Sequence, residues 1–137
     1  MSIELKGLED VLGRIDHITD PEALERALGQ ACALVERSAK MKAPKGTGEL
    51  RRSITSKVEN NEGIIYTPLE YAPYVEYGTG LFAEEGGRKD VPWRYKDDEG
   101  NWHTTSGMNP QPYMRPALDE NREQIIRLLK GALLKDD

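Results

Sequence analysis

The chain has 137 residues, enough for one ordinary domain, and 37% of them are hydrophobic. Its formal net charge is −5, so the chain as a whole lacks the positive charge that binding to nucleic-acid phosphates requires. We therefore expect no specific nucleic-acid partner. One local basic group is interrupted by Gly, Pro and Glu49, and we expect it to face solvent or another protein. It consists of Lys40, Lys42, Lys45, Arg51, Arg52 and Lys57.

Cysteine usage and hydropathy argue against further classes of protein: disulfide-bonded, secreted and membrane-spanning. Cys32 is the only cysteine, which rules out an intrachain disulfide. The first residues include several acidic side chains and no apolar core of the signal-peptide type. No apolar run is long enough to span a membrane. We expect a protein that is made in a reducing cytoplasm, or kept in a particle assembled there, and that has no membrane partner.

The N-terminal part predicts a strand and two helical segments. Apolar residues alternate with polar ones over 2–6, which predicts a short strand, and they recur at helical spacing over 8–15. Asp20 followed by a proline is a helix-start signal. A long helix is predicted from about Pro21 to Met41, because one apolar stripe runs along it. The stripe consists of Leu24, Ala27, Leu28, Ala31, Leu34 and Val35.

The next segment predicts an antiparallel β-hairpin. Apolar residues recur on one side of a strand from Leu50 to Val58. Asn60-Asn61-Glu62-Gly63 is a hairpin-turn signal. A return strand from Ile64 to Thr67 follows, and Pro68 stops it. We expect these two strands to pack on the long helix.

The segment from Leu69 to Tyr77 predicts a short helical turn. Its tyrosines and a valine recur at spacings of three and four, and Gly78 is placed to cap it. We expect Tyr71 and Tyr74 to lie in the core.

No compact pattern continues from Thr79 to Asn109. Gly86-Gly87 and the charges around them indicate a mobile loop. Within this stretch, 91–96 and 102–105 predict two strands that flank a turn at 97–101. The acidic turn lacks the alternating ligand spacing and the late bidentate Glu of a calcium loop, so we interpret it as a polar hairpin turn.

Two prolines, Pro112 and Pro116, lead into a last predicted helix. Acidic residues gather in its early turns and basic residues in its late turns, which matches the helix macrodipole. Its apolar face consists of Leu118, Ile125, Leu129, Ala132 and Leu133. The predicted fold class is therefore α+β: a small antiparallel β-sheet packed against a long N-terminal helix and a C-terminal helix. We expect a single domain over 1–137, with a flexible loop or hairpin arm at about 79–109.

Residues that commonly carry chemistry do not form a recognisable set. His17 and His103 are far apart, and with Cys32 they make a poor start for a zinc site. Gly46-Thr47-Gly48 lacks the spacing of a phosphate-binding P-loop. No nucleophile stands in a recognisable elbow or beside a candidate base. We expect no catalytic residue, no cofactor, no metal and no small-molecule substrate.

Large aromatic side chains are the most distinctive feature of the irregular region. Tyr and Trp combine a large contact area with a polar tip and are enriched in interfaces. The plainer alternative is that they cover the sheet and close the core. We take five side chains, in or beside this region, as a candidate assembly interface, and we expect the arm at 79–109 to become ordered against a neighbouring subunit or another protein. They are Trp93, Tyr95, Trp102, His103 and Tyr113.

Three blocks of sequence carry a family resemblance. Ala43-Pro44 with 47–54 resembles an "AP…TGxLRxSI" pattern, and 71–80 resembles "YAxYVEYGT". The block 110–118 resembles "xPQPFLRPAL", with Tyr and Met in place of Phe and Leu. In this order they resemble the family of phage tail-component or neck proteins named after gene product ten of a lambdoid siphophage. The stretch 92–105 is similar to the "PWxYKDxxGxWHxT" version found in prophages of Gram-positive bacteria.

The resemblance implies a structural virion or prophage protein without chemistry of its own. It implies a ring-forming subunit around the DNA channel that joins the head to the tail or completes the tail end. Its partners would be other copies of itself and phage head-completion, connector and tail proteins. Its location would be the neck or tail of a virion assembled in the bacterial host cytoplasm. The nearest alternative is a tail-terminator or minor tail protein. Alternatives from other classes are a small hydrolase or nuclease and a nucleic-acid-binding regulator.

Overall fold

A computed structural model describes residues 1–4, 21–84, 87, 90–97 and 99–133. The helical segment predicted over 8–15, and His17, lie outside the described residues. The chain forms two compact units. The first unit joins Met1–Pro68 to Tyr113–Asp137, and the second unit is Leu69–Pro112. The second unit contains the predicted arm together with the tyrosine-bearing segment before it.

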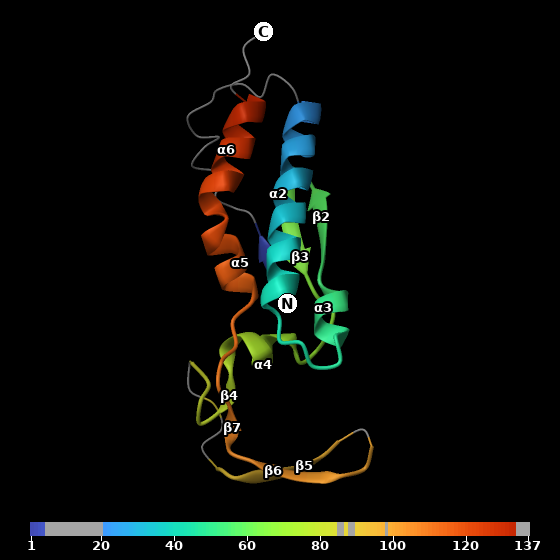
Figure 1. The fold of residues 1–137 in the computed structure, drawn as a ribbon, viewed down its shortest axis with the longest axis vertical. Coiled ribbons are helices and arrows are strands. Elements are labelled where there is room, and N and C mark those ends of the chain that lie inside the picture. Colours follow the sequence, from blue (N-terminus) through green and yellow to red (C-terminus); the bar gives the residue numbers. More distant parts are fainter. Residues whose placement is uncertain (5–20, 85–86, 88–89, 98, 134–137) are drawn as a thin grey trace. The chain divides into compact units, whose positions relative to one another are not determined.

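A long helix is the centre of the first unit. This helix, α2 (Pro21–Lys42), confirms the prediction almost to the residue. Its buried side chains recur every three or four positions, and Leu24, Leu28 and Val35 are fully inaccessible to solvent. The helix lies between the β-sheet on one side and the C-terminal helices on the other (Figure 1). Its side chains therefore form the core together with the sheet on one side and with the C-terminal helices on the other.

Within the described residues, the sheet of the first unit has three strands. They are β1 (Ser2–Glu4), β2 (Thr55–Glu59) and β3 (Glu62–Tyr66), in the order β1-β3-β2 with both pairs antiparallel. The turn between β2 and β3 is Asn60-Asn61, whose φ angles are 52° and 62°. Positive φ at both positions is typical of a type I′ turn, which matches the twist of the strands. The predicted hairpin is confirmed, and its turn sets Glu59 opposite Glu62.

The prediction of a strand over 50–58 is wrong for its first half. Residues Glu49–Ser53 form a short helix, α3, and β2 begins only at Thr55. Leu50 and Ile54 are both buried, and a separation of four residues puts two side chains on one face of either a strand or a helix. The helix propensity of the residues favours a helix over a strand here, because Glu, Leu and Arg are strong helix formers.

The C-terminal part forms two helices where one was predicted. They are α5 (Met114–Glu120) and α6 (Arg122–Leu133), and both pack on α2. Asn121 separates them, and its side-chain Nδ2 donates a hydrogen bond to the Ala117 carbonyl oxygen at 2.7 Å. Asn side chains compete in this way with the backbone bonds of a helix. The side chains of Ile125 and Leu129 are buried, as the predicted apolar face requires.

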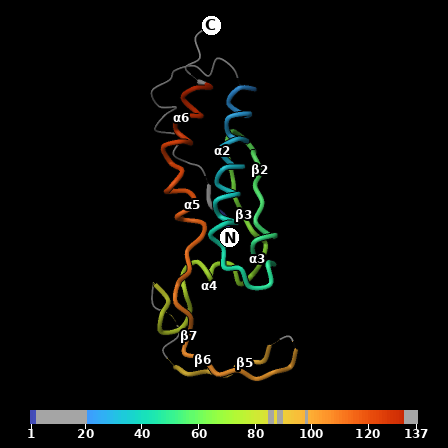
Figure 2. The backbone as a smooth tube through the Cα atoms, in the orientation of Figure 1, coloured from blue at the N-terminus to red at the C-terminus, as the bar shows by residue number. Residues whose placement is uncertain are grey.

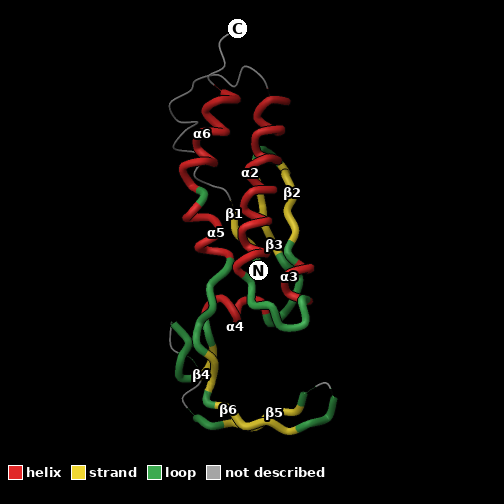
Figure 3. The backbone as a smooth tube through the Cα atoms, in the orientation of Figure 1, coloured by secondary structure: helices red, strands yellow, loops and turns green. Residues whose placement is uncertain are grey.

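The described residues of the second unit form one short helix and four short strands. The helix α4 (Ala72–Tyr77) ends at Gly78, which confirms the predicted helical turn and its cap. The strands β4 (Thr79–Gly80) and β7 (Gly107–Met108) pair antiparallel. The strands β5 (Trp93–Lys96) and β6 (Trp102–Thr105) form the predicted second hairpin. Figures 2 and 3 trace both strand pairs.

The β4–β7 pair brings two backbones very close together. Gly80 and Gly107 face each other across this pair with φ angles of 62° and 125°. A Cβ on Gly80 would collide with the Ser106 carbonyl oxygen, and one on Gly107 would collide with the Thr79 carbonyl oxygen. Only glycine combines these φ angles with so close an approach. The chain leaves and re-enters this pair on either side of the β5–β6 hairpin, so the two glycines form the base of the arm.

Candidate assembly surface

The tyrosines of the second unit point outward. Tyr71, Tyr74 and Tyr77 recur every three residues and are 39%, 58% and 40% exposed. Ala72 and Val75, which alternate with them around α4, are buried. The prediction that Tyr71 and Tyr74 lie in the core is therefore wrong. The buried residues of α4 are Ala72, Val75 and the fully buried Glu76, and the large rings lie away from them.

Exposed apolar side chains gather in the second unit. Nine large hydrophobic side chains are exposed among the described residues, and eight of them belong to Leu69–Pro112. Monomeric proteins usually keep such side chains scattered, so their concentration in one unit makes this unit the candidate contact surface. We call these eight the exposed apolar set. They are Tyr71, Tyr74, Tyr77, Leu81, Phe82, Tyr95, Trp102 and Met108.

One face of the β5–β6 hairpin carries a stacked pair held by the turn. Tyr95 lies opposite His103 across the strands, and their rings stack with centroids 5.2 Å apart. His103 Nε2 lies 2.6 Å from Asp97 Oδ2. The other carboxylate oxygen of Asp97 accepts hydrogen bonds from the backbone N–H of Glu99 at 3.0 Å and of Asn101 at 2.8 Å. The predicted polar hairpin turn is confirmed.

These contacts act on the charge of Asp97. The hydrogen bond with His103 lowers the pKa of Asp97 below its ordinary value, and the backbone N–H of Asn101 lowers it further. A carboxylate that accepts several hydrogen bonds stays ionised at neutral pH. The turn of the hairpin therefore keeps a fixed negative charge.

The opposite face of the hairpin is basic. Arg94 and Lys96 alternate with Trp93 and Tyr95 along β5, so they point to the other side of the ribbon. The Arg94 guanidinium lies 5.1 Å from the centre of the Trp102 ring, a cation–π distance. Trp102 also lies opposite Lys96 in the strand register and is 60% exposed. We call Arg94, Lys96 and Trp102 the basic face.

Trp93 has a different environment. It is half-buried and borders a cavity of about 520 Å³ together with Tyr74 and the backbone of Gly78, Gly80 and Gly87. The rings of Trp93 and Tyr74 and the side chain of Ala83 give this cavity a mostly apolar lining, as ligand pockets usually have.

The structure brings together four of the five predicted interface residues. Trp93, Tyr95, Trp102 and His103 all lie on the β5–β6 hairpin. Tyr113 does not join them. It precedes α5 in the first unit, its side chain is fully buried, and its hydroxyl lies 3.7 Å from Met1 Sδ.

The α4 tyrosines were missed as surface residues although a signal was present. Ala72 and Val75 lie three residues apart and so share one side of a helix, which offers an apolar alternative to the tyrosines. Sequence reasoning followed aromatic character alone and therefore chose the wrong side of α4.

Other chemical features of the described residues are few. They contain no group of three or more His, Cys, Asp or Glu side chains placed to hold a metal ion. Cys32 is buried in α2, and this burial raises the pKa of its thiol, which disfavours the reactive thiolate. In the described part of the chain, no helix has the length and apolar character needed to cross a membrane.

An α+β chain that concentrates its exposed apolar side chains in one unit has the features of a protein that assembles with other chains. Its sequence matches the family described as "Bacteriophage HK97-gp10, putative tail-component" over residues 6–78. This match covers more than half of the 137 residues, so the chain belongs to this family of structural phage tail components. No curated protein matches the chain, and no solved structure does. The β5–β6 hairpin follows the matched residues.

Proposed function

We propose that this tail component is a ring-forming subunit around the DNA channel that joins the phage head to the tail or completes the tail end. Family membership supports a structural role in the virion. The concentration of eight of the nine exposed large hydrophobic side chains in Leu69–Pro112 carries the proposal. In this role the chain has no catalytic function. Its partners are other copies of itself and connector or tail proteins, and it assembles in the host cytoplasm.

The composition of the exposed surface fits contact with protein. Tyr, Trp, Met and Arg are the residues enriched in interface cores, and all four occur on the described part of the second unit. An isolated two-stranded hairpin is marginally stable in water, and β5–β6 exposes aromatic rings on both faces. Contact with a partner would cover these rings and stabilise the hairpin.

The charge of the chain fits a conduit for DNA. A net charge of −5 gives little attraction for phosphate, so DNA would pass without being held tightly. We therefore place the binding energy of this protein in contacts with other proteins.

The test replaces the gene in its phage with the Tyr95→Ala, Trp102→Ala double variant. Both side chains are exposed, so the purified subunit should keep its native circular dichroism. Filled heads and complete tails should accumulate separately. Met41→Ala is the matched control, because Met41 is a 75% exposed apolar residue on α2 of the first unit. If the double variant joins heads to tails normally, the β5–β6 hairpin is not the contact surface for joining. If infectious particles form without the gene, the protein does not have the joining role.

A further inference from the structure

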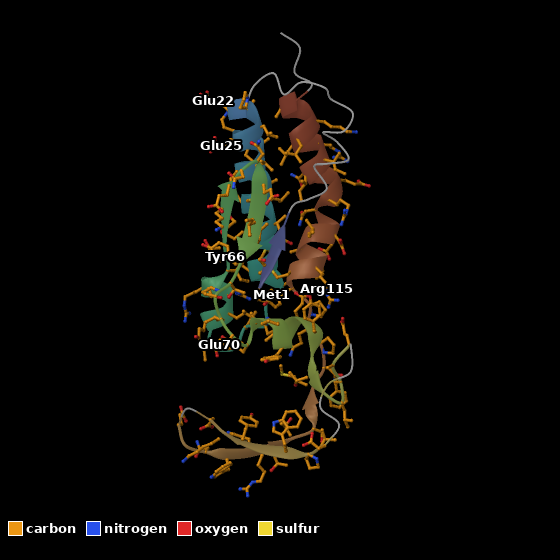
Figure 4. The ribbon with its side chains drawn as sticks, turned by 180° about the vertical axis from the view of Figure 1, so that it is seen from behind. Met1, Glu22, Glu25, Tyr66, Glu70 and Arg115 are labelled. Atoms are coloured by element: carbon orange, nitrogen blue, oxygen red, sulfur yellow. The ribbon has the colours of Figure 1, made fainter. Side chains whose placement is uncertain are left out.

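A shallow acidic groove lies beside the start of α2 in the first unit. It has a volume of about 550 Å³ and is lined by Glu22, Glu25, Arg26, Gly29 and Val58. Figure 4 shows Glu22 and Glu25 on the first turns of α2. At Gly29 nothing lies within 4 Å of the position of an added Cβ, so the groove is open there. Val58, on β2, gives the groove a half-buried apolar side chain.

The groove follows an open edge of the sheet. β2 is an outer strand in the order β1-β3-β2, and β3 is its one partner among the described strands. Residues that flank a two-residue turn form a hydrogen-bonded pair, so Glu59 and Lys57 direct their backbone groups toward β3. Ser56 and Val58, which alternate with them, direct theirs toward the open edge. Such an edge is a ready acceptor for another strand.

The basic face of the β5–β6 hairpin is complementary to the two carboxylates of this groove, which outnumber its one cation, Arg26. Arg94 and Lys96 supply two positive charges around the exposed indole of Trp102. Within the described part of the chain, neither cation takes part in an ion pair, and neither does Glu25. Charges of opposite sign, an exposed ring and an open groove therefore occur on two different patches of the same chain.

We infer that the basic face of one subunit's β5–β6 hairpin docks into the groove between α2 and the β2 edge of a second copy. A hairpin strand added beside β2 turns one of its faces toward α2. With the basic face on that side, Arg94 and Lys96 meet Glu22 and Glu25, and Trp102 covers Val58. Because the two patches differ, the contact is head-to-tail, and repetition of such a contact closes a ring when the rotation allows it. This inference rests on the proposed ring-forming role and names its subunit contact.

Charge reversal with rescue tests the contact. Sedimentation of the purified full chain at low salt should show self-association that weakens as salt is added. Arg94→Glu with Lys96→Glu should weaken it at least tenfold, and so should Glu25→Lys. A mixture of these two reversed proteins should associate more strongly than either alone, because opposite charges face each other again. Lys130→Glu reverses an exposed cation on α6 and should change nothing.

Crosslinking then tests the geometry between chains. Chains with Glu25→Cys are mixed with chains with Lys96→Cys and oxidised, while the buried Cys32 stays in place. The mixed dimer should exceed both homodimers. The inference is overturned if the wild-type chain does not self-associate at low salt. It is also overturned if neither charge reversal changes the association and the mixed dimer does not exceed the homodimers. Either result leaves the virion role open to the separate particle assay. If the contact forms but its loss leaves heads joined to tails, the contact stands but head–tail joining does not depend on it.

Discussion

His103 Nε2 lies 2.6 Å from Asp97 Oδ2, so a side chain of β6 is tied to the first residue of the turn that precedes it. The same carboxylate accepts two backbone hydrogen bonds within the turn, and the imidazole stacks on Tyr95 of β5. One acidic side chain thus connects the turn to both strands. The order of this hairpin should depend on the ionised state of Asp97.

Acidification should loosen the hairpin. The pKa of Asp97 is lower in the folded chain than in the unfolded chain, so its contribution to stability is complete above the unfolded pKa, about 3.9. That contribution is lost as pH falls through the folded pKa. NMR should show the amide signals of Glu99 and Asn101 moving together below about pH 4.

Asp97→Asn should abolish this transition and leave the hairpin less ordered at neutral pH. Asp119→Asn, which removes an exposed carboxylate paired with Arg122 in the first unit, should leave the hairpin signals unchanged. Persistence of the same titration in Asp97→Asn would assign it to another group.

Gly107→Ala should disrupt the base of the arm. The added Cβ meets the Thr79 carbonyl oxygen, and φ at this position is 125°. The destabilisation should be about 1–3 kcal/mol for the strand pair. Hydrogen exchange should show faster exchange at the β4–β7 amides, with α2 unchanged. Gly131→Ala is the matched control, because Gly131 lies on α6 with open space around it and should gain roughly 0.5–1 kcal/mol. Equal exchange in the two variants would contradict this account of Gly107.

The sequence predicted correctly those elements whose residue spacing or turn residues fit one type of secondary structure only. The α2 stripe at Leu24, Leu28 and Val35 fits a helix and no strand, and the Asn60-Asn61 turn fits a tight hairpin. The α3 segment failed because Leu50 and Ile54 satisfy both periods. Such a segment is decided by helix preference and packing, which its apolar pattern does not reveal.

The candidate surface was predicted less completely, for a different reason. Aromatic identity is shared by core and interface residues, so it placed Tyr113 on the surface and Tyr74 in the core, opposite to their positions in the structure. Position within the hairpin was more informative, since a two-stranded ribbon has little interior in which to bury Tyr95 or Trp102. The tie between His103 and Asp97 depends on the turn geometry, which composition does not specify.

Binding to duplex DNA should be weak and without sequence preference. The net charge of −5 opposes phosphate contacts. Fluorescence anisotropy with labelled duplexes at physiological salt should give dissociation constants no tighter than about 10⁻⁴–10⁻⁶ M, the range of non-specific binding. Submicromolar binding that selects one sequence would instead support a regulator.

Leu28→Ala should destabilise the first unit by about 2–5 kcal/mol, because Leu28 is fully buried and its truncation leaves a cavity. Urea denaturation followed by circular dichroism measures the change. Met41→Ala on the same helix removes a 75% exposed side chain and should change stability by less than about 0.5 kcal/mol. Equal midpoints for the wild type and Leu28→Ala would show that the stripe is not buried in solution.

Tryptophan fluorescence should report directly on assembly through the hairpin. The chain has two tryptophans, Trp93 and Trp102, and both lie on β5–β6. Trp102 is 60% exposed, so its emission in the free subunit should be that of an indole in water. Trp93→Phe leaves Trp102 as the sole emitter and replaces a half-buried ring with another aromatic ring.

When this single-tryptophan variant associates, the emission of Trp102 should move to shorter wavelength, because the ring leaves water for a protein contact. The shift should follow the concentration dependence seen by sedimentation and should reverse on addition of salt, since Arg94 and Lys96 lie on the same face as Trp102. The Trp102→Phe variant, which keeps Trp93, should shift less, because that ring is already half-buried before association. Association with no change in the emission of Trp102 would place the subunit contact elsewhere on the molecule.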